Sequence, residues 1–200
     1  MKVTVIDYRA GNLTSVVKAL RSLGADVVVT ENAEAVQSAE RIVLPGVGHF
    51  AATRRLEETG IRAAVAEAIT RKVPFLGICV GLQWLFAGST EAPECPGLAA
   101  LPGGCHRFAP GRKVPHVGWN SLSIGSESRL LADVGDGSFA YFTHSYWAPV
   151  GAATVAVTTY GEPFSAAVER GSVMGVQFHP EKSGETGLKV LRNFLEFPSC

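Results

Sequence analysis

A cysteine between two glycines is the strongest candidate for chemistry in this sequence. Residues 77–81 read Gly-Ile-Cys-Val-Gly, with an apolar, strand-like run before Cys79 and a helical pattern after it. A sharp strand-to-helix turn strains the backbone of a nucleophile and brings neighbouring chain close, which glycine permits. The start of a helix also favours thiolate over thiol. The pattern therefore predicts a nucleophilic Cys79, against the alternative of a buried structural cysteine.

A histidine and a carboxylate follow near the end of the chain, where residues 176–181 read Val-Gln-Phe-His-Pro-Glu. Residues two apart in an extended segment point the same way, so His179 and Glu181 are expected on one face. Pro180 disfavours a helical turn at His179. Such a pair alone is usually a surface ion pair, but with Cys79 it predicts a nucleophile, a base and an orienting group. The order Cys, His, Glu differs from that of the α/β-hydrolases, which disfavours their fold.

A glycine-rich loop supplies candidate oxyanion donors. Residues 45–48 read Pro-Gly-Val-Gly directly after a predicted strand, and glycines let backbone N–H groups turn toward a substrate. Together with the N–H of Val80, which follows the nucleophile, this loop is predicted to form an oxyanion hole. An ordinary glycine turn is the alternative interpretation.

The elements needed to position these residues alternate through the first half of the chain. Apolar runs predict strands at residues 2–7, 26–30, 41–44 and 74–78. Helical periodicity predicts helices at 13–23, after the N-cap Asn12, and at 33–39, 50–57, 61–71 and 80–87. Short apolar strands that alternate with helices favour a parallel sheet covered on both faces. The expected fold is therefore α/β, with an open, mostly parallel central sheet flanked by helices.

The second half of the chain has a different sequence pattern. Gly, Pro and Ser turns separate shorter predicted strands at residues 105–108, 115–124, 139–143, 154–159, 165–169 and 172–178, and an amphipathic helix is predicted at 184–197. These segments favour an additional antiparallel part in the C-terminal half. A length of 200 residues fits one domain, residues 1–200.

Composition limits the partners and the cofactors. Lys plus Arg and Asp plus Glu balance at 18 each, so neither a nucleic acid nor a membrane is expected as a partner. The sequence shows no signal peptide and no bilayer-spanning run, which favours a cytoplasmic protein. The four cysteines lack the spacing of a zinc site, so no metal is expected.

Taken together, the three motifs resemble those of the class I, or triad-type, glutamine amidotransferases over essentially the whole chain. Residues 6–12 (Ile-Asp-Tyr-Arg-Ala-Gly-Asn), 115–120 (Pro-His-Val-Gly-Trp-Asn) and 144–146 (His-Ser-Tyr) narrow the likeness to the glutaminase subunits of imidazole glycerol phosphate synthases. This resemblance implies a flavodoxin-like sheet, L-glutamine as substrate and no cofactor. His49 and Leu82 depart from the commonest pattern, in which a small residue and a methionine stand at these positions.

The resemblance also implies a role for individual residues. Cys79 is the implied nucleophile, His179 the general base and then acid, and Glu181 the group that fixes the imidazole. The implied oxyanion donors are the N–H group of Val80 and, in the loop, that of either Val47 or Gly48. Substrate binding is implied for Gly46, Gln83, His144, Ser145 and Tyr146, and contact with the partner subunit for Asn12, Trp119, Asn120 and Lys182.

The implied partner is a barrel-shaped cyclase subunit, which forms a heterodimer with the glutaminase and makes imidazole glycerol phosphate and AICAR in histidine biosynthesis. Ammonia released into neutral water becomes ammonium, which is no nucleophile, so a protected path to an acceptor enzyme is expected. Two alternatives stay open: a glutaminase for another acceptor, such as pyridoxal phosphate synthase or anthranilate synthase, and a thiol hydrolase that transfers no ammonia. The intact triad argues against a third, a non-catalytic subunit.

Overall fold

Strands and helices alternate through the first half of the protein, as the sequence predicts. The structure is a computed structural model that describes residues 1–10 and 13–198, so the predicted N-cap Asn12 lies outside the described residues. The strands are β1 (Lys2–Ile6), β2 (Asp26–Thr30), β3 (Ile42–Leu44) and β4 (Phe75–Ile78). The helices are α1 (Leu13–Ser22), α2 (Ala33–Gln37), the 3-10 turn η1 (Phe50–Thr53), α3 (Arg54–Glu58), α4 (Ile61–Thr70) and α5 (Val80–Trp84).

The second half consists mainly of strands. They are β5 (His106–Arg107), β6 (His116–Ser121), β7 (Ser123–Ile124), β8 (Phe139–His144), β9 (Tyr146–Trp147), β10 (Thr154–Tyr160), β11 (Glu162–Arg170) and β12 (Val173–Val176). A 3-10 turn, η2 (Pro180–Lys182), and the helix α6 (Gly184–Glu196) follow. The sequence did not predict β9 or η2.

One sheet joins the two halves. Its strand order is β2-β1-β3-β4-β12-β11-β10-β7, and the first five strands pair in parallel. The remaining pairs of this sheet are antiparallel, as are β6 with β8 and β5 with β9. The predicted α/β fold with an antiparallel C-terminal part is therefore confirmed. Because Val176 of β12 lies beside Ile78 of β4, the segments after these strands meet at one edge.

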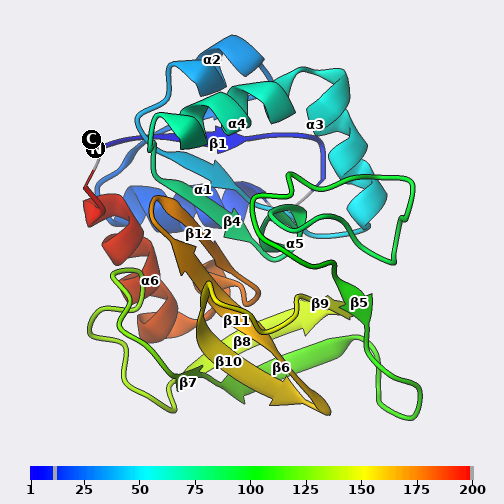
Figure 1. The fold of residues 1–200 in the computed structure, drawn as a ribbon. Helices are drawn as coiled ribbons and strands as arrows, with labels where there is room; N and C mark the ends of the chain where they lie inside the picture. Colours follow the sequence, from blue (N-terminus) through cyan, green and yellow to red (C-terminus); the bar gives the residue numbers. More distant parts are fainter. Residues whose placement is uncertain (11–12, 199–200) are drawn as a thin grey trace.

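Two groups of helices cover the parallel half of the sheet. The residues of β3, β4 and β12 are buried along their whole length, so apolar side chains must pack on both faces. Figure 1 shows α2, α3 and α4 as one group and α1 with α6 as another. The buried side chains of α6 follow helical spacing at Val190, Leu191, Phe194 and Leu195.

Two predicted elements have different ends in the structure. The predicted strand 115–124 breaks at the buried Leu122, and its halves join different sheets, β6 with β8 and β7 with β10. The helix predicted to reach residue 87 ends at Trp84, because N–H groups of a distant loop take its last carbonyls. Leu98 donates to the Trp84 carbonyl at 2.6 Å and Ala99 to that of Phe86 at 3.1 Å. Such long-range contacts leave no local sequence signal. Among the described residues, no helix is both long and apolar enough to span a bilayer.

Candidate active site

Cys79 lies directly after β4 in a strained turn. Its φ of 53° and ψ of −105° are unfavourable for a residue with a Cβ atom, and its backbone N–H donates to the Val176 carbonyl of β12 at 2.8 Å. A Cβ atom at Gly77 would overlap the carbonyl of Gly81, and one at Gly81 would overlap the carbonyl of Leu44. The predicted steric need for glycine on both sides of the cysteine is therefore confirmed.

His179 and Glu181 form a buried pair beside it. The imidazole Nδ1 lies 3.0 Å from the Glu181 Oε1, and the two side chains are only 1% and 2% exposed. His179 itself is extended, with φ of −96° and ψ of 99°, as the following proline predicts. The predicted extended conformation is wrong only from Pro180 on, because Pro180 opens the 3-10 turn η2. Proline fits the first position of such a turn since it lacks an N–H that would need a partner. The two side chains meet through this turn and not through strand alternation.

The charges of this pair favour a protonated imidazole. Burial lowers the pKa of His179, but hydrogen bonding to, and the negative charge of, the ionised Cys79 sulfur and the Glu181 carboxylate outweigh it and raise the pKa to about 9. The Nε2 of His179 is buried and makes no hydrogen bond of good geometry within the described residues. That nitrogen is therefore free to exchange a proton with the sulfur or with a bound substrate.

A cavity of about 130 Å³ opens at the sulfur. Its lining comprises Gly48, Cys79, Val80, Gln83, Glu91, Pro115, Thr143, His144, Ser145 and Tyr146. Most of the residues predicted to bind substrate therefore surround one hollow. A larger cavity of about 530 Å³ lies around Phe197, but among the described residues no cysteine or histidine lines it. Of these two cavities, the smaller one contains the cysteine.

The predicted oxyanion donors are only partly arranged around this cavity. Gly48 and Val80 line it, whereas Val47 does not. The N–H of Val80 lies 3.4 Å from the Gly46 carbonyl and points to it, so the loop itself occupies this donor. Gly46 is buried behind the cavity, where a Cβ atom would overlap the Tyr8 hydroxyl. In this conformation the loop offers an incomplete oxyanion hole.

Gln83 and His144 are held by hydrogen bonds within the protein. The Gln83 Nε2 donates to the Tyr146 carbonyl at 3.0 Å and to the Gln177 Oε1 at 3.1 Å. The His144 Nδ1 donates to the same carbonyl at 2.8 Å, so its Nε2 accepts from the His116 Nδ1 at 3.3 Å. Burial lowers the pKa of His144 to about 3 and that of His116 to about 4. Both imidazoles are therefore neutral at pH 7.

Glu91 is a candidate site residue that the sequence analysis missed. It lines the cavity, and its Oε2 accepts the backbone N–H of Phe50 at 2.7 Å. A lone glutamate in an irregular loop carries no motif, so only the fold reveals its position. His49, whose role the sequence left undefined, caps η1 by accepting the N–H of Ala51 at 3.1 Å.

The residues predicted to meet a partner lie around the antiparallel pair of β6 and β8. Trp119 is 55% exposed and so is not a core residue, and Val117 and Phe139 are exposed as well. The Lys182 Nζ lies 5.9 Å from the ring centroid of Tyr141, which in turn contacts Trp119 edge to face. Asn120 donates to the Thr159 carbonyl and lies 3.4 Å from the His116 Nε2. The structure thus gathers three of the four predicted interface residues; the fourth, Asn12, is not described.

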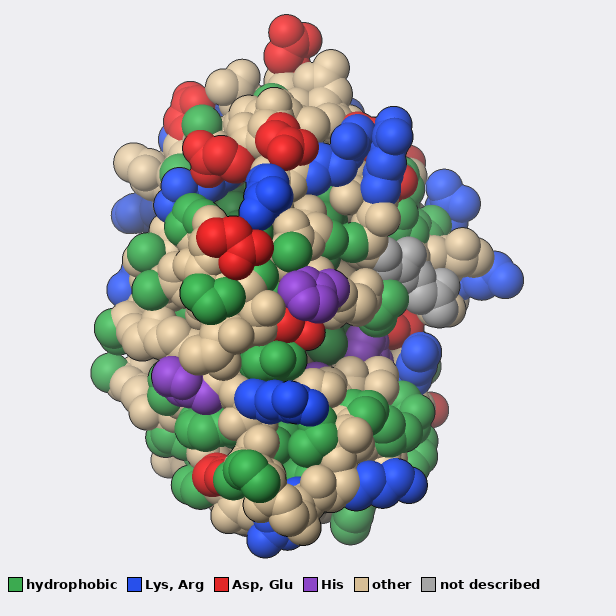
Figure 2. All heavy atoms as spheres, turned by 90° about the vertical axis from the view of Figure 1, so that its right-hand side faces the viewer, with side chains coloured by type: hydrophobic (Ala, Val, Ile, Leu, Met, Phe, Trp, Pro, Cys, Tyr) green, Lys and Arg blue, Asp and Glu red, His purple; other side chains and the backbone are tan. Residues whose placement is uncertain are grey.

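The carboxyl ends of the parallel strands form the face that carries the site. The arrowheads of β1 and β4 point to the right in Figure 1, so Figure 2 looks onto this edge. Lys and Arg side chains are interspersed there with Asp and Glu, and histidines lie near the middle. Within the described ranges, no group of three or more His, Cys, Asp or Glu side chains could hold a metal ion.

Comparison with known proteins identifies the family. A model of glutamine amidotransferase class-I matches residues 4–197. The chain is 48% identical to the imidazole glycerol phosphate synthase subunit HisH of Methanothermobacter thermautotrophicus, over 97% of this chain and 98% of that one. It is 47% identical to the subunit of the same name from Deinococcus radiodurans, over 96% and 92%.

Two further matches are a longer relative and a solved structure with the same fold. A 45% identical relative in Arabidopsis thaliana, imidazole glycerol phosphate synthase hisHF, matches 96% of this chain over 34% of its own length. A solved glutamine amidotransferase of 23% identity superposes with a TM-score of 0.77, over 97% of both chains, and supports the fold alone. The chain therefore belongs to the class I glutamine amidotransferases and, within them, to the HisH subunits of imidazole glycerol phosphate synthase.

Proposed function

We propose that residues 1–200 act as a single cytoplasmic glutaminase domain, which hydrolyses L-glutamine and passes the ammonia to a cyclase subunit in a heterodimer. The cyclase then makes imidazole glycerol phosphate and AICAR. The observation that carries this proposal is the buried pair of His179 and Glu181 beside Cys79, at the edge of a small cavity. The close relation to HisH subunits favours this acceptor over pyridoxal phosphate synthase or anthranilate synthase.

The chemistry follows from the charges of the triad. With a pKa of about 9, His179 holds a proton at neutral pH. The thiolate form of Cys79 is the attacking species in the proposed step. The sulfur attacks the side-chain carboxamide carbon of glutamine, and His179 gives its proton to the departing ammonia. The neutral imidazole then takes a proton from water, which cleaves the glutamyl thioester and releases glutamate.

Oxyanion stabilisation in this proposal requires a movement of the loop 45–48. The Val80 N–H is directed at the Gly46 carbonyl, and turning this peptide away would free it for the tetrahedral intermediate. One oxyanion donor contributes about 3 to 4 kcal/mol in other acyl-transfer enzymes. Glutaminase activity of the isolated subunit should therefore be low, and binding of the cyclase should raise it.

Glu91 gives the cavity a means to select glutamine. Its carboxylate faces the same hollow as the sulfur, where it would pair with the α-ammonium group of the substrate. Ser145 and Tyr146 line the same cavity, where they would hold the backbone and the side-chain amide of the glutamine. A thiol hydrolase without ammonia transfer would have no need of this amino-acid recognition.

The proposed docking surface is the exposed apolar group of Val117, Trp119 and Phe139 on β6 and β8. Large aromatic side chains on a rigid strand are typical binding anchors, and truncation of one commonly costs about 2 kcal/mol, or about thirtyfold in Kd. Trp119→Ala is therefore expected to weaken cyclase binding and to leave the fold intact.

A glutaminase assay with and without purified cyclase tests the proposal. Glutamate release by the wild-type subunit should rise when the cyclase and a ligand of its active site are added, and Cys79→Ala should abolish it. Trp119→Ala should show the same maximal rate at a higher cyclase concentration. Full activity without the cyclase, or unchanged activity of Cys79→Ala, would refute the proposal. Activation by another purified acceptor synthase, and not by the cyclase, would redirect it.

A further inference from the structure

Gln177 is fully buried between β12 and the triad histidine, and its side chain reaches the sulfur of Cys79. The Gln177 Nε2 lies 3.5 Å from the Cys79 Sγ, and its Oε1 accepts a hydrogen bond from the Gln83 Nε2 at 3.1 Å. A buried amide is costly unless both of its ends are bonded. The sulfur is thus the partner that satisfies the nitrogen end of this amide.

The orientation of the Gln83 and Gln177 side-chain amides follows from the Tyr146 carbonyl, which both Gln83 and His144 contact. The Tyr146 carbonyl can only accept, and it receives hydrogen bonds from the His144 Nδ1 and from the Gln83 side chain. The nitrogen of Gln83 must therefore face this carbonyl, and the same nitrogen contacts Gln177. The atom of Gln177 at that contact must be its oxygen. Its nitrogen consequently faces the sulfur.

Two contacts of the Cys79 sulfur favour different protonation states, one the thiol and the other the thiolate. The Thr143 carbonyl, 4.0 Å away, can accept only from the thiol. The Gln177 amide can donate to the thiolate, and hydrogen bonds to an ionised acceptor are about twice as strong as neutral ones. The other titratable groups around Cys79 are His179, the buried Tyr8, and Glu91 and His144 across the cavity.

We infer that Gln177 is a further catalytic residue, whose side-chain N–H donates to the Cys79 thiolate and holds the sulfur in place for attack on the carboxamide. Gln83 is the positioning residue that fixes this amide through the Tyr146 carbonyl. The inference rests on the proposed function, since it assigns Gln177 to the same reaction. In the thioester the sulfur carries no charge, so the hydrogen bond is strongest before acylation and after release of glutamate.

Alkylation of Cys79 by iodoacetamide tests this inference without requiring glutaminase activity. The rate is measured from pH 5 to 10 by mass spectrometry of the peptide that contains Cys79, which separates it from the other cysteines. In Gln177→Met, the pH of half-maximal rate should rise by about one unit. On the acidic limb of the profile, alkylation at a given pH should fall about tenfold, and kcat should fall with it. An unchanged pH profile in a folded Gln177→Met variant would overturn the inference.

Thr158→Val is the matched control, because it also removes a buried hydrogen bond, to the Ser121 carbonyl, far from the sulfur. It should lower stability but leave the alkylation profile unchanged, and an equal shift in this variant would overturn the inference. If Gln177→Met does not fold, Gln177→Glu gives the second test. Its carboxylate should raise the pH of half-maximal alkylation further, and no rise would count against the inference.

A measurement on the wild-type protein completes the test. The sequence has only three glutamines, Gln37, Gln83 and Gln177, so their side-chain amide signals can be assigned by ¹⁵N NMR. Alkylation of Cys79 should shift the Gln177 signal most and leave that of the exposed Gln37 unchanged; no shift at Gln177 would refute the contact. Failure of glutamine hydrolysis in the wild type would refute the proposed function, whereas failure of these readouts refutes only the role of Gln177.

Discussion

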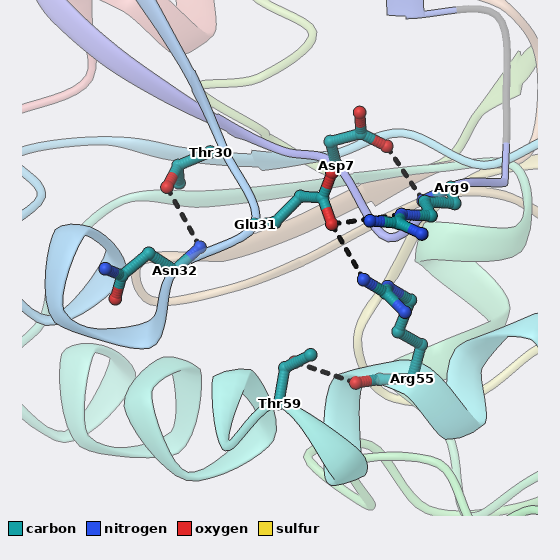
Figure 3. A network of polar contacts seen from close by, with 7 residues as sticks. All are labelled: Asp7, Arg9, Thr30, Glu31, Asn32, Arg55 and Thr59. Carbon is teal, nitrogen blue, oxygen red and sulfur yellow. Dashed lines mark hydrogen bonds and ion pairs between the residues drawn. The ribbon is translucent and has the colours of Figure 1, made fainter.

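Two polar networks lie at the ends of the parallel strands, and they differ mainly in their contact with water. Figure 3 shows the exposed one, in which Glu31, directly after β2, accepts from the Arg9 Nε at 3.1 Å and from the Arg55 Nη2 at 2.7 Å. The side chains of Arg9 and Glu31 are 67% and 40% exposed. The pair of His179 and Glu181 has similar distances but almost no exposure. Similar geometry therefore occurs in two very different dielectric surroundings.

This difference in exposure decides which polar contacts affect the chemistry of the protein. Water solvates an exposed ion pair whether or not it forms, so its net contribution is small and depends on salt. In the buried network no water replaces a lost partner, and each group shifts the protonation of its neighbours. Substitutions in the buried network should therefore alter activity strongly, and substitutions in the exposed network should not.

The largest expected effect is that of His179→Asn, which removes the proposed general base and acid beside the sulfur. General acid–base catalysis contributes about 10² to 10⁴-fold, and loss of the imidazolium also disfavours the thiolate. We expect kcat for glutamine hydrolysis to fall about 10³ to 10⁴-fold in the cyclase complex. Thermal unfolding serves as the control for folding. A loss smaller than tenfold would show that another group carries the proton.

Glu181→Gln should have a smaller effect with a specific pH dependence. The amide keeps a hydrogen-bonding partner for His179 but removes the negative charge that helps to raise its pKa to about 9. The imidazolium is then lost at lower pH, so kcat should fall about 10 to 100-fold, most strongly between pH 7 and 9. Steady-state rates from pH 6 to 9 measure this. A uniform loss at all pH values would mean that Glu181 only orients the ring.

The parts of the fold and of the site that could be predicted are those specified by residues close together in the sequence. The glycines around Cys79 and the alternating strands of the first half follow from steric needs and periodicity, and both are confirmed. The turn at Pro180 was wrongly predicted as extended, because the rule used describes strands and the chain leaves β12 at Val176. His179 and Glu181 still meet, since a short turn also brings side chains two residues apart together.

The rest depends on contacts between segments far apart in the chain. Glu91 reaches the cavity from a loop that carries no motif. Gln177 contacts the Cys79 sulfur only because β12 pairs with β4 in the folded sheet. The short strand β9 forms because Tyr146 and Trp147 pair with Arg107 and His106 of β5, far earlier in the chain. Such pairings depend on the folded arrangement and leave no trace in a local window of sequence.

The buried pair of His116 and His144 should make the protein sensitive to acid. Both are neutral in the native state, with pKa values lowered to about 4 and about 3, whereas an unfolded histidine titrates near 6.5. Below pH 6.5 the unfolded chain binds more protons than the native one, so this stability is complete above pH 6.5 and is lost as the pH falls toward 4. The slope is at most about 1.4 kcal/mol per pH unit for each histidine.

Urea unfolding of the wild type and of His116→Gln at pH 4.5, 5.5 and 6.5 measures this effect. The variant lacks one of the two titrating groups, so its free energy of unfolding should fall less steeply with acid. The carboxylates titrate in both proteins and cancel in the comparison. Equal slopes would mean that His116 is protonated in the native protein, contrary to its stacking on Tyr160 and its bond to His144.

The smallest expected effect belongs to Glu31→Gln in the exposed network. The hydrogen bond from Arg55, followed by the charge of Arg9, lowers the pKa of Glu31, so its contribution is present at neutral pH and is lost as the pH falls below the usual range of a carboxyl group. Because water screens both ion pairs, Tm should change by no more than about 2 °C at low salt and not at all in 1 M NaCl. Glutamine hydrolysis with the cyclase should be unchanged, since Glu31 lies outside the cavity. A large loss of activity in this variant would show that the two networks are coupled, and the contrast between them would no longer hold.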